Sequence, residues 1–444
     1  MRRRLSIALS LATIVLSHWQ CRLVAVAAPP QAVKSRDAQV VATFVLPDVR
    51  LSKIQNDALP GSLANDRRIM LGGFSDLWRD QDDPPGVFWT VTDRGPNGEA
   101  KVDGQKRRTF PVPDFTPLLL RIEAQDDSLQ VLETIPIVGQ SGVPVSGLPN
   151  LAELDDGGFD FQGEESVEPN VNGLDVEGLV RTPTGEFWVA EEYRPSLVRI
   201  DSTGRVRKRF VPADQDLPQA DCEVVANLPS VYARRQDNRG FEGLALSPDG
   251  RTLYAPMQSP LANPSRKVGR RSRNCRILAF DIESERPVAE YVYRFDAATE
   301  FASDAEPSAM KIGAMAMTSQ NEMLVLERTD GEAKVYAVEL DGASDILPTP
   351  WHDSTGSDSL EALADPATAD VRVLPKRLVV DLSKLQHVPD KIEGLAVVDA
   401  WHIALVNDND FGFKRFDARG NAVDNGVRSM LVLVKLGEPL MLSN

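Results

Sequence analysis

The tripeptide Glu-Gly-Leu opens a strand-like segment at three places in this chain of 444 residues. The copies are Glu177-Gly178-Leu179, Glu242-Gly243-Leu244 and Glu393-Gly394-Leu395, and each is followed by apolar residues and a turn. Equivalent positions in the repeated units of a closed, repeated fold gather around one axis. The recurrence therefore predicts that the three glutamates are neighbours in space.

The residues around each copy predict a β-hairpin. In the middle copy, two short apolar runs flank Ser247-Pro248-Asp249-Gly250, a proline-led turn that closes with glycine. The first copy has Pro183 and Gly185 at the same turn positions, and the last copy keeps the strands around a different turn. Two degenerate copies, at 72–94 and 313–328, bring the related units to five.

The spacing of these units leaves room for more than one hairpin each. Units that start at 177, 242, 313 and 393 lie 65, 71 and 80 residues apart, and further strand-like runs follow the hairpins at 196–200, 276–281, 333–340 and 430–435. About four antiparallel strands fit each unit, and no amphipathic helix recurs between them. We therefore expect an all-β fold, a β-propeller of five or six blades with loop insertions. The segment between 94 and 177 is long enough for a sixth blade or a large insertion, and Val40 to Leu46 is a candidate ring-closing strand.

The first residues form a separate element. Arg2-Arg3-Arg4 precede an apolar stretch, Leu5 to Leu16, and Ala25-Val26-Ala27 supplies the small residues that a signal peptidase reads. We expect a signal peptide at 1–27, an N-terminal segment at 28–64 and the propeller at 65–444. Because the apolar stretch is shorter than the roughly 20 residues of a membrane-spanning helix, export to the periplasm or the medium is favoured over an uncleaved anchor.

The charge of the mature chain limits its partners. Removal of residues 1–27 takes away four arginines and no acid, so the formal net charge goes from −16 to −20. Such a chain repels nucleic acid and anionic membranes and attracts cations. Cys222 and Cys275 remain, either as one disulfide or as two free buried thiols. The three mature histidines lack zinc-ligand spacing and no G-x-S-x-G elbow is present, which argues against zinc and serine hydrolases.

A second pattern recurs where the outgoing strand of each hairpin ends. Acidic residues stand there beside arginine or further acids: Asp93-Arg94 in the first unit, Glu191-Glu192-Tyr193-Arg194 in the second, Glu327-Arg328 in the fourth and Asn407-Asp408-Asn409-Asp410 in the last. The third unit has Met257-Gln258 instead. The start of one strand and the end of the next lie at the same edge of a hairpin. We therefore expect one polar mouth that holds these side chains together with the three glutamates.

Carboxylates crowded in one mouth need positive partners. Two like charges about 4 Å apart repel by about 4 kcal/mol at an effective dielectric near 20. The acids must be protonated, paired with arginine or bound to a metal, and oxygen ligands favour hard cations such as Ca²⁺. In an architectural interpretation, Arg94, Arg194 and Arg328 simply neutralise the glutamates. In a functional one, the excess acids hold metal ions that, with the arginines, bind phosphate oxygens and stabilise phosphoryl transfer.

Five segments of the chain resemble one known family. They are F-W-T-V-T-D-R-G-P-N (88–97), G-L-D-V-E-G-L (173–179), W-V-A-E-E-Y-R-P-S (188–196), N-R-G-F-E-G-L-A-L-S-P-D-G (238–250) and K-I-E-G-L-A (391–396). Together they look like the phytase-like domain family, "esterase-like activity of phytase", over roughly residues 65 to 435. The resemblance implies a secreted or periplasmic protein whose repeated acids carry a phosphoesterase activity on phytate or related phosphoesters.

The resemblance and the charge pattern together define a working hypothesis. Ca²⁺ is held by acids from the set Asp93, Glu177, Glu191, Glu327, Glu393 and Asp408. Arg94, Arg194 and Arg328 bind a small phosphorylated substrate, and Glu192 or Glu242 is the general base that acts on an attacking water. Two other functions stay open: a Ca²⁺-dependent lactonase or sugar-ester hydrolase of propeller type, and a non-enzymatic binding propeller.

Overall fold

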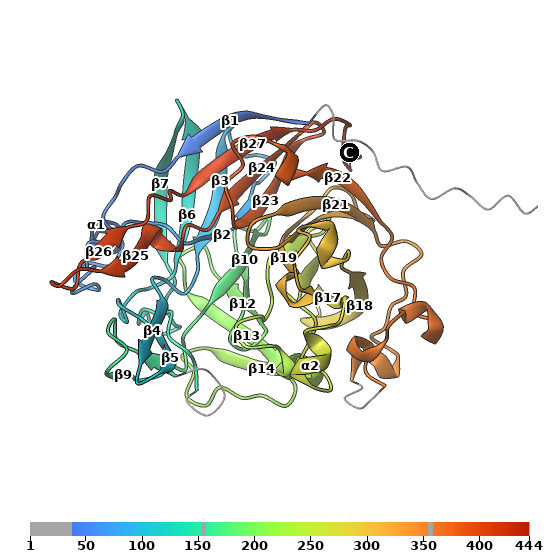
Figure 1. The fold of residues 1–444 in the computed structure, drawn as a ribbon, viewed down its shortest axis with the longest axis horizontal. Coiled ribbons are helices and arrows are strands. Elements are labelled where there is room, and N and C mark those ends of the chain that lie inside the picture. Colours follow the sequence, from blue (N-terminus) through green and yellow to red (C-terminus); the bar gives the residue numbers. More distant parts are fainter. Residues whose placement is uncertain (1–37, 152–156, 354–357, 444) are drawn as a thin grey trace, which may run out of the picture. The chain divides into compact units, whose positions relative to one another are not determined.

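Strands dominate the computed structural model, which describes residues 38–151, 157–353 and 358–443 (Figure 1). The predicted signal peptide at 1–27 lies outside these residues. All described residues belong to one structural unit, Lys34–Asn444. The all-β class expected from the sequence is confirmed.

Most strands of the described residues fall into five groups. The first is β2 (Phe74–Trp78), β3 (Val87–Thr92), β6 (Leu118–Gln125) and β7 (Ser128–Pro136). The second is β10 (Val176–Arg181), β11 (Phe187–Glu191), β12 (Ser196–Ile200), β13 (Val206–Pro212) and β14 (Glu223–Leu228). The third is β15 (Ala245–Leu246), β16 (Thr252–Pro256), β17 (Asn274–Asp281) and β18 (Arg286–Arg294). The fourth is β19 (Lys311–Met317), β20 (Glu322–Arg328), β21 (Ala333–Glu339) and β22 (Lys376–Asp381). The fifth is β23 (Ile392–Asp399), β24 (His402–Asn407), β27 (Met430–Lys435) and β1 (Gln39–Val45).

The N-terminal strand β1 joins the fifth group to the first. It pairs antiparallel with β27 along most of its length, and Val45 makes a single parallel pairing with Ser128 of β7. The two groups therefore form one eight-stranded sheet, whereas the other three groups are separate sheets.

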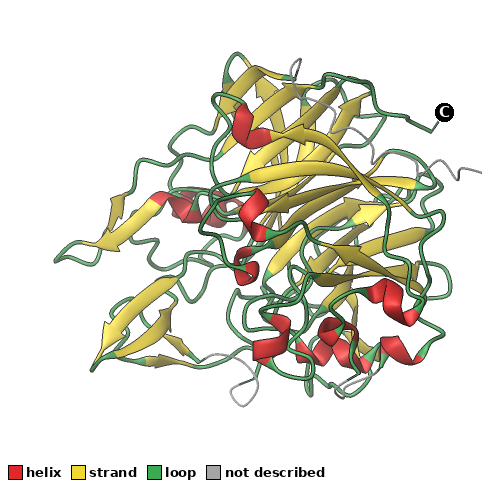
Figure 2. Ribbon diagram, turned by 45° about the vertical axis from the view of Figure 1, so that its right-hand side comes forward, coloured by secondary structure: helices red, strands yellow, loops and turns green. Residues whose placement is uncertain are grey.

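Smaller elements lie in the connections between these strands (Figure 2). Two small sheets consist of β4 (Gly98–Val102), β5 (Gln105–Thr109), β8 (Gly158–Phe159) and β9 (Ser166–Val167), and of β25 (Phe413–Phe416) and β26 (Ala422–Asp424). The α-helices are α1 (Leu51–Ala58) and α2 (Arg266–Gly269). Short 3-10 helices cover Ser230–Arg234, Ala298–Glu300, Pro307–Ala309, Pro350–His352, Leu360–Ala362, Pro366–Ala369, Leu382–Lys384 and Asp410–Gly412. The described part of the segment between 94 and 177 holds β6 and β7 of the first group together with the small four-stranded sheet, in which β8 and β9 have only two residues each.

The first strands of the five groups contact one another in turn. Strand β2 contacts β10, β10 contacts β15, β15 contacts β19, β19 contacts β23, and β23 contacts β2. The approach leaves no room for a side chain at the middle residue of the tripeptide: a Cβ on Gly178 would lie 2.5 Å from the backbone of Gly243, and one on Gly394 would lie 2.7 Å from the backbone of Asp76. Glycine in Glu-Gly-Leu is therefore a packing requirement.

Asp76 ties three of these strands together from the inside. Its carboxylate is fully buried and accepts backbone N–H groups from Leu77 (2.8 Å), Leu179 (2.8 Å) and Leu244 (3.2 Å). Burial raises the pKa of Asp76 well above its ordinary value, and the three N–H donors oppose that shift. The contacts fix the first strands of the first three groups relative to one another.

Apolar side chains on both faces of the strands fill the spaces between neighbouring groups. Every residue of β11 is buried, and Trp188 stacks on Phe210 with ring centroids 5.6 Å apart. Phe280 of the next group packs against both rings. Cys222 and Cys275 are free thiols beside different core clusters, so the disulfide considered from the sequence does not form in this structure.

Candidate functional site

The polar residues of interest lie at one edge of the hairpins, where each first strand begins and each second strand ends. At this edge the backbone N–H of the second-strand residue donates to the first-strand carbonyl in the pairs Glu192 with Asp175, Asp408 with Lys391, Asp93 with Gly73 and Gln258 with Gly240, and Arg328 pairs with Lys311. We call this set of five facing pairs, with Glu177, Glu242, Glu393 and Arg94, the mouth.

β-Bulges aim the repeated glutamates. The register of β10 against β11 shifts at Glu177, and that of β23 against β24 shifts at Glu393. A bulge inserts one extra residue and redirects its side chain. Glu177 and Glu393 consequently reach the mouth. Burial raises the pKa of Glu177 well above its ordinary value, and the charges of Asp175, Glu242 and Glu393 add to the shift.

Arg328 pairs with two of the three glutamates. Its Nη2 contacts Glu393 Oε1 and lies 3.6 Å from Glu242 Oε1, and its side chain is only 1% exposed. Gln258 Nε2 donates to Glu242 Oε2 at 2.6 Å. Burial raises the pKa of Glu242 well above its ordinary value, as do the charges of Glu393 and Glu192, whereas Arg328 lowers it.

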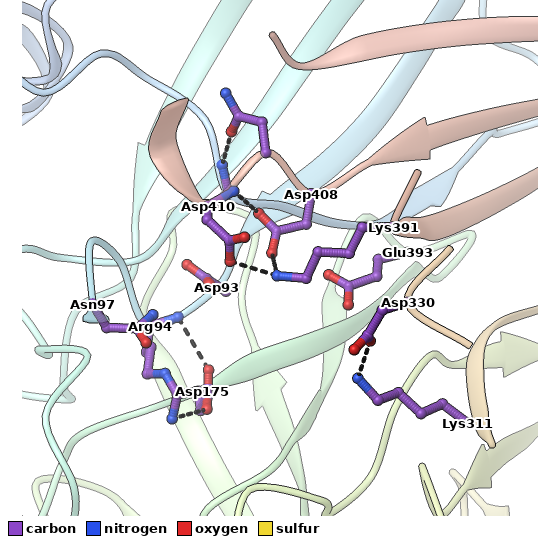
Figure 3. Close-up of polar contacts among 12 residues, drawn as sticks. Asp93, Arg94, Asn97, Asp175, Lys311, Asp330, Lys391, Glu393, Asp408 and Asp410 are labelled. Carbon is purple, nitrogen blue, oxygen red and sulfur yellow. Dashed lines mark hydrogen bonds and ion pairs between the residues drawn. The ribbon is translucent and has the colours of Figure 1, made fainter. Parts of the chain in front are cut away.

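Lys391 balances the acids next to Glu393 (Figure 3). Its Nζ lies 2.5 Å from Asp408 Oδ2 and 2.5 Å from Asp410 Oδ1. Burial opposes the ionisation of Asp408, but the charge of Lys391 and the hydrogen bonds that Asp408 accepts outweigh it, and the pKa of Asp408 is lowered. A similar pair, Lys311 with Asp330 at 2.6 Å, lies nearby.

The second group has three acids close together, and Arg94 pairs with one of them. One carboxylate oxygen from each of Asp175, Glu177 and Glu192 lies within 4.8 Å of the other two. Arg94 Nη1 contacts Asp175 Oδ2 at 2.8 Å. Glu192 is 1% exposed, and neither of its carboxylate oxygens has a hydrogen-bond partner among the described residues. Burial, together with the charge of Asp175, raises the pKa of Glu192 to about 8.

These three carboxylates fit a hard cation. An all-oxygen donor set is the kind that Ca²⁺ binds, and a buried carboxylate without partners demands either a proton or a cation. Glu177 is partly exposed, so the cluster has access to solvent. A hard cation is thus a chemically suitable occupant of this cluster.

Most of the residues singled out from the sequence do meet at the mouth. Asp93, Glu177, Glu192, Glu242, Glu393, Asp408, Arg94 and Arg328 all belong to it. Asp93 accepts the backbone N–H of Gly95 at 2.7 Å. Burial raises its pKa well above the ordinary value, and the charges of Asp408 and Asp175 add to the shift.

Glu191 and Glu327 do not join the mouth. Glu191 is fully buried and is held by Arg209 Nη2 (2.7 Å) and the Ser196 hydroxyl (3.0 Å). Glu327 accepts from Lys376 Nζ at 2.7 Å and from the Tyr293 hydroxyl. Successive residues of a strand point to opposite faces. In Glu191-Glu192 and in Glu327-Arg328, only the second residue therefore faces the mouth.

Arg194 is buried behind the end of the same strand. Its side chain is 3% exposed, and its backbone N–H donates to Glu191 Oε2 at 3.0 Å. Its place as a substrate-binding residue stays a prediction.

Sequence reasoning missed three charged members of the mouth: Asp175, Lys391 and Lys311. Asp175 and Lys391 each stand two residues before a tripeptide glutamate, in D-V-E-G-L and K-I-E-G-L. A spacing of two on a strand places side chains on one face. This two-residue spacing could have identified Asp175 and Lys391 from the sequence. It also shows that one unit has an acid at the position where another unit has a lysine.

Comparison with known proteins finds a curated relative and several distant structures. An "Uncharacterized secreted protein" of Arthroderma benhamiae is 26% identical over 327 residues, which is 62% of this chain and 63% of the relative. The match thus spans less than two thirds of that protein's length. Among the described residues, no helix is long and apolar enough to cross a membrane.

The distant structures include a PQQ-bound aldose sugar dehydrogenase from Streptomyces coelicolor (9% identity, 89% of this chain and 98% of that chain, TM-score 0.33). They also include the calcium-binding protein regucalcin from Agrobacterium tumefaciens (11% identity, 85% and 93%, TM-score 0.33). TM-scores this low define neither fold nor function. Residues 69–411 match the family described as "Esterase-like activity of phytase", and the chain belongs to this phytase-like family.

Proposed function

We propose that this chain is an exported, cation-dependent hydrolase of phosphoric esters that acts at the mouth of a five-bladed β-propeller. The blade count rests on the contacts of the first strands, which run from β2 through β10, β15, β19 and β23 back to β2. In this proposal residues 65–444 form the propeller, β1 from the 28–64 segment completes the fifth blade, and 1–27 are a signal peptide. The N-terminal arginines with their apolar stretch, and the name of the secreted relative, support export.

The observation that carries the proposal is the close approach of three carboxylates, Asp175, Glu177 and Glu192, of which Asp175 pairs with Arg94 and Glu192 has no hydrogen-bond partner for either oxygen among the described residues. A phosphate dianion is repelled by such a cluster unless a cation neutralises it first. The three carboxylates would hold that cation, with Ca²⁺ as the first candidate. When bound, a hard cation supplies Lewis-acid polarisation of a phosphoryl oxygen.

The chain's own residues supply the proton transfer in this proposal. Gln258 and Arg328 hold the carboxyl group of Glu242 in place, and burial raises its pKa, which favours the protonated form. Glu242 thus acts as a general acid that gives its proton to the leaving alkoxide; the water that attacks phosphorus releases a proton to solvent, and Glu242 takes a proton back from solvent. Glu192, the other catalytic candidate, serves as a cation ligand instead. Asp175 orients Arg94 beside the cluster.

The test is hydrolysis of a panel of phosphate monoesters and diesters by the purified mature chain. We expect turnover with added Ca²⁺, loss on chelation, and at least a roughly tenfold loss in Asp175→Asn and Glu177→Gln. Glu168→Gln, which changes an exposed acid in a loop, is the matched control. Absence of hydrolysis of every ester with every metal tried would exclude the proposal. If metal raised the melting temperature without turnover, a binding propeller would be the better description.

One observation favours a second function, a Ca²⁺-dependent lactonase or sugar-ester hydrolase. Arg94 and Arg328 are both engaged by carboxylates of the chain, which reduces what they offer to phosphate. Lactone hydrolysis needs no arginine cluster. A substrate panel separates the two functions: turnover of lactones or sugar esters with Ca²⁺, without hydrolysis of any phosphate ester, would favour the second function.

A further inference from the structure

Two arginines at the mouth, unlike Arg94 and Arg328, are held by neutral partners. Arg108 Nη1 donates to Asn97 Oδ1 at 3.0 Å, and Arg239 Nη1 donates to the Ser259 hydroxyl at 2.7 Å. Neither guanidinium forms an ion pair with a carboxylate within residues 38–151, 157–353 and 358–443. Both side chains are partly exposed. Most of their N–H donors are therefore available to a ligand from solvent.

Arg239 is presented by a tight turn beside the acids. Its backbone N–H closes the turn by donating to the Gln236 carbonyl at 3.1 Å, and Asn238 adopts the left-handed conformation with φ +53°. The next residue, Gly240, approaches Glu192 so closely that a Cβ would lie 2.3 Å from the Glu192 carbonyl oxygen. Burial lowers the pKa of Arg239, and the charges of Glu192 and Glu242 oppose that shift. Arg239 therefore lies beside the residues that the second and third groups of strands contribute to the mouth.

Arg108 approaches from the small sheet on the side of Arg94. Strand β5 holds it opposite Glu99 of β4. Its partner Asn97 donates to the Gly95 carbonyl at 3.1 Å, next to Arg94 (Figure 3). Burial and the charge of Arg94 lower the pKa of Arg108, whereas Glu99 and Asp175 raise it. Arg108 therefore lies on the Asp175 side of the acid cluster, and Arg239 lies on the Glu192 side.

We propose that Arg108 and Arg239 are the anion-binding residues of the mouth and take the phosphate dianion of a monoester above the three-carboxylate cluster. This inference rests on the proposed function and replaces Arg94 and Arg328 in the substrate-binding role. A planar guanidinium with unused donors binds two phosphate oxygens at once. Arg94 and Arg328, held by Asp175 and Glu393, then keep the acids in position.

The test is binding of inorganic phosphate by calorimetry, with Ca²⁺ and phosphate kept below the solubility limit of calcium phosphate. Arg239→Ala and Arg108→Ala should each weaken binding about tenfold, which corresponds to about 1.4 kcal/mol. Arg239→Lys should fall between wild type and Arg239→Ala, because lysine keeps the charge and loses the planar fork. Arg286→Ala, which removes an exposed arginine on β18, should bind phosphate like wild type.

Two results would overturn the inference: phosphate affinity within about twofold of wild type in both alanine variants, or no phosphate binding by the wild-type chain with Ca²⁺. Should Arg239→Ala fail to give a cooperative melting curve, Arg239→Lys and Arg108→Ala carry the test. Arginine-dependent phosphate binding without ester turnover supports the anion site and refutes the proposed function. Ester turnover with an unchanged KM in both alanine variants supports the proposed function and refutes the anion site.

Discussion

The two sides of the mouth differ in how far their crowded carboxylates are paired with positive side chains. On the side of the fourth and fifth groups, Arg328 and Lys391 lie among Glu242, Glu393 and Asp408, and every one of these acids has a cationic partner. On the side of the second group, Asp175, Glu177 and Glu192 lie close together, and Arg94 forms an ion pair with Asp175. The first side is complete as architecture. The second needs a proton or a cation from outside, and for this reason we propose it as the binding side.

The largest effect is expected on the paired side. Arg328→Met leaves Glu242 and Glu393 buried without their shared cation, and breaking a buried pair in this way costs about 3–5 kcal/mol. Urea denaturation should show the loss as a lower midpoint. A loss below about 1 kcal/mol would mean that Arg328 does not neutralise these acids.

A pH-dependent effect is expected on the unpaired side. In metal-free protein the pKa of Glu192 is about 8, above the ordinary 4.5. The folded state therefore holds the proton more tightly than the unfolded state. The stabilisation is complete below about pH 4.5 and is lost as the pH rises through about 8.

The size of this effect follows from about 1.4 kcal/mol per pKa unit, so the loss is on the order of a few kcal/mol. Glu192→Gln should remove that part of the pH dependence in chelator and, with it, most of the stabilisation by Ca²⁺. Thermal melts between about pH 5 and 9 measure both. If the melting temperature of the Glu192→Gln variant changed with pH in parallel with that of the wild type, the proposed difference between the two sides would be wrong.

The smallest effect is expected where a pair is open to water. Asp410 is 60% exposed, so Asp410→Asn should cost less than about 1 kcal/mol. Asp408 is 3% exposed and shares the same lysine, so Asp408→Asn should cost more. Equal losses in the two variants, measured by urea denaturation, would show that burial does not set the strength of the Lys391 pairs.

Local patterns predicted much of the fold. The proline-led turns and apolar runs marked the hairpins, and the later runs 196–200 and 430–435 coincide with β12 and β27. The tripeptide glycines also have a local signature, although their reason is the close approach of neighbouring strands. The segment between 94 and 177 was less readable, because its strands β6 and β7 carry no copy of the tripeptide.

The amino-acid sequence by itself determined that polar and acidic residues recur at one edge of the hairpins, since turn chemistry and strand period are local properties. Only the tertiary structure decided which acids share a cation. Strand alternation turned Glu191 and Glu327 away to Arg209 and Lys376. Arg328 of the fourth group contacts Glu242 of the third group and Glu393 of the fifth group. Charge pairing depends on distances between segments far apart in the chain, and a one-dimensional pattern does not contain those distances.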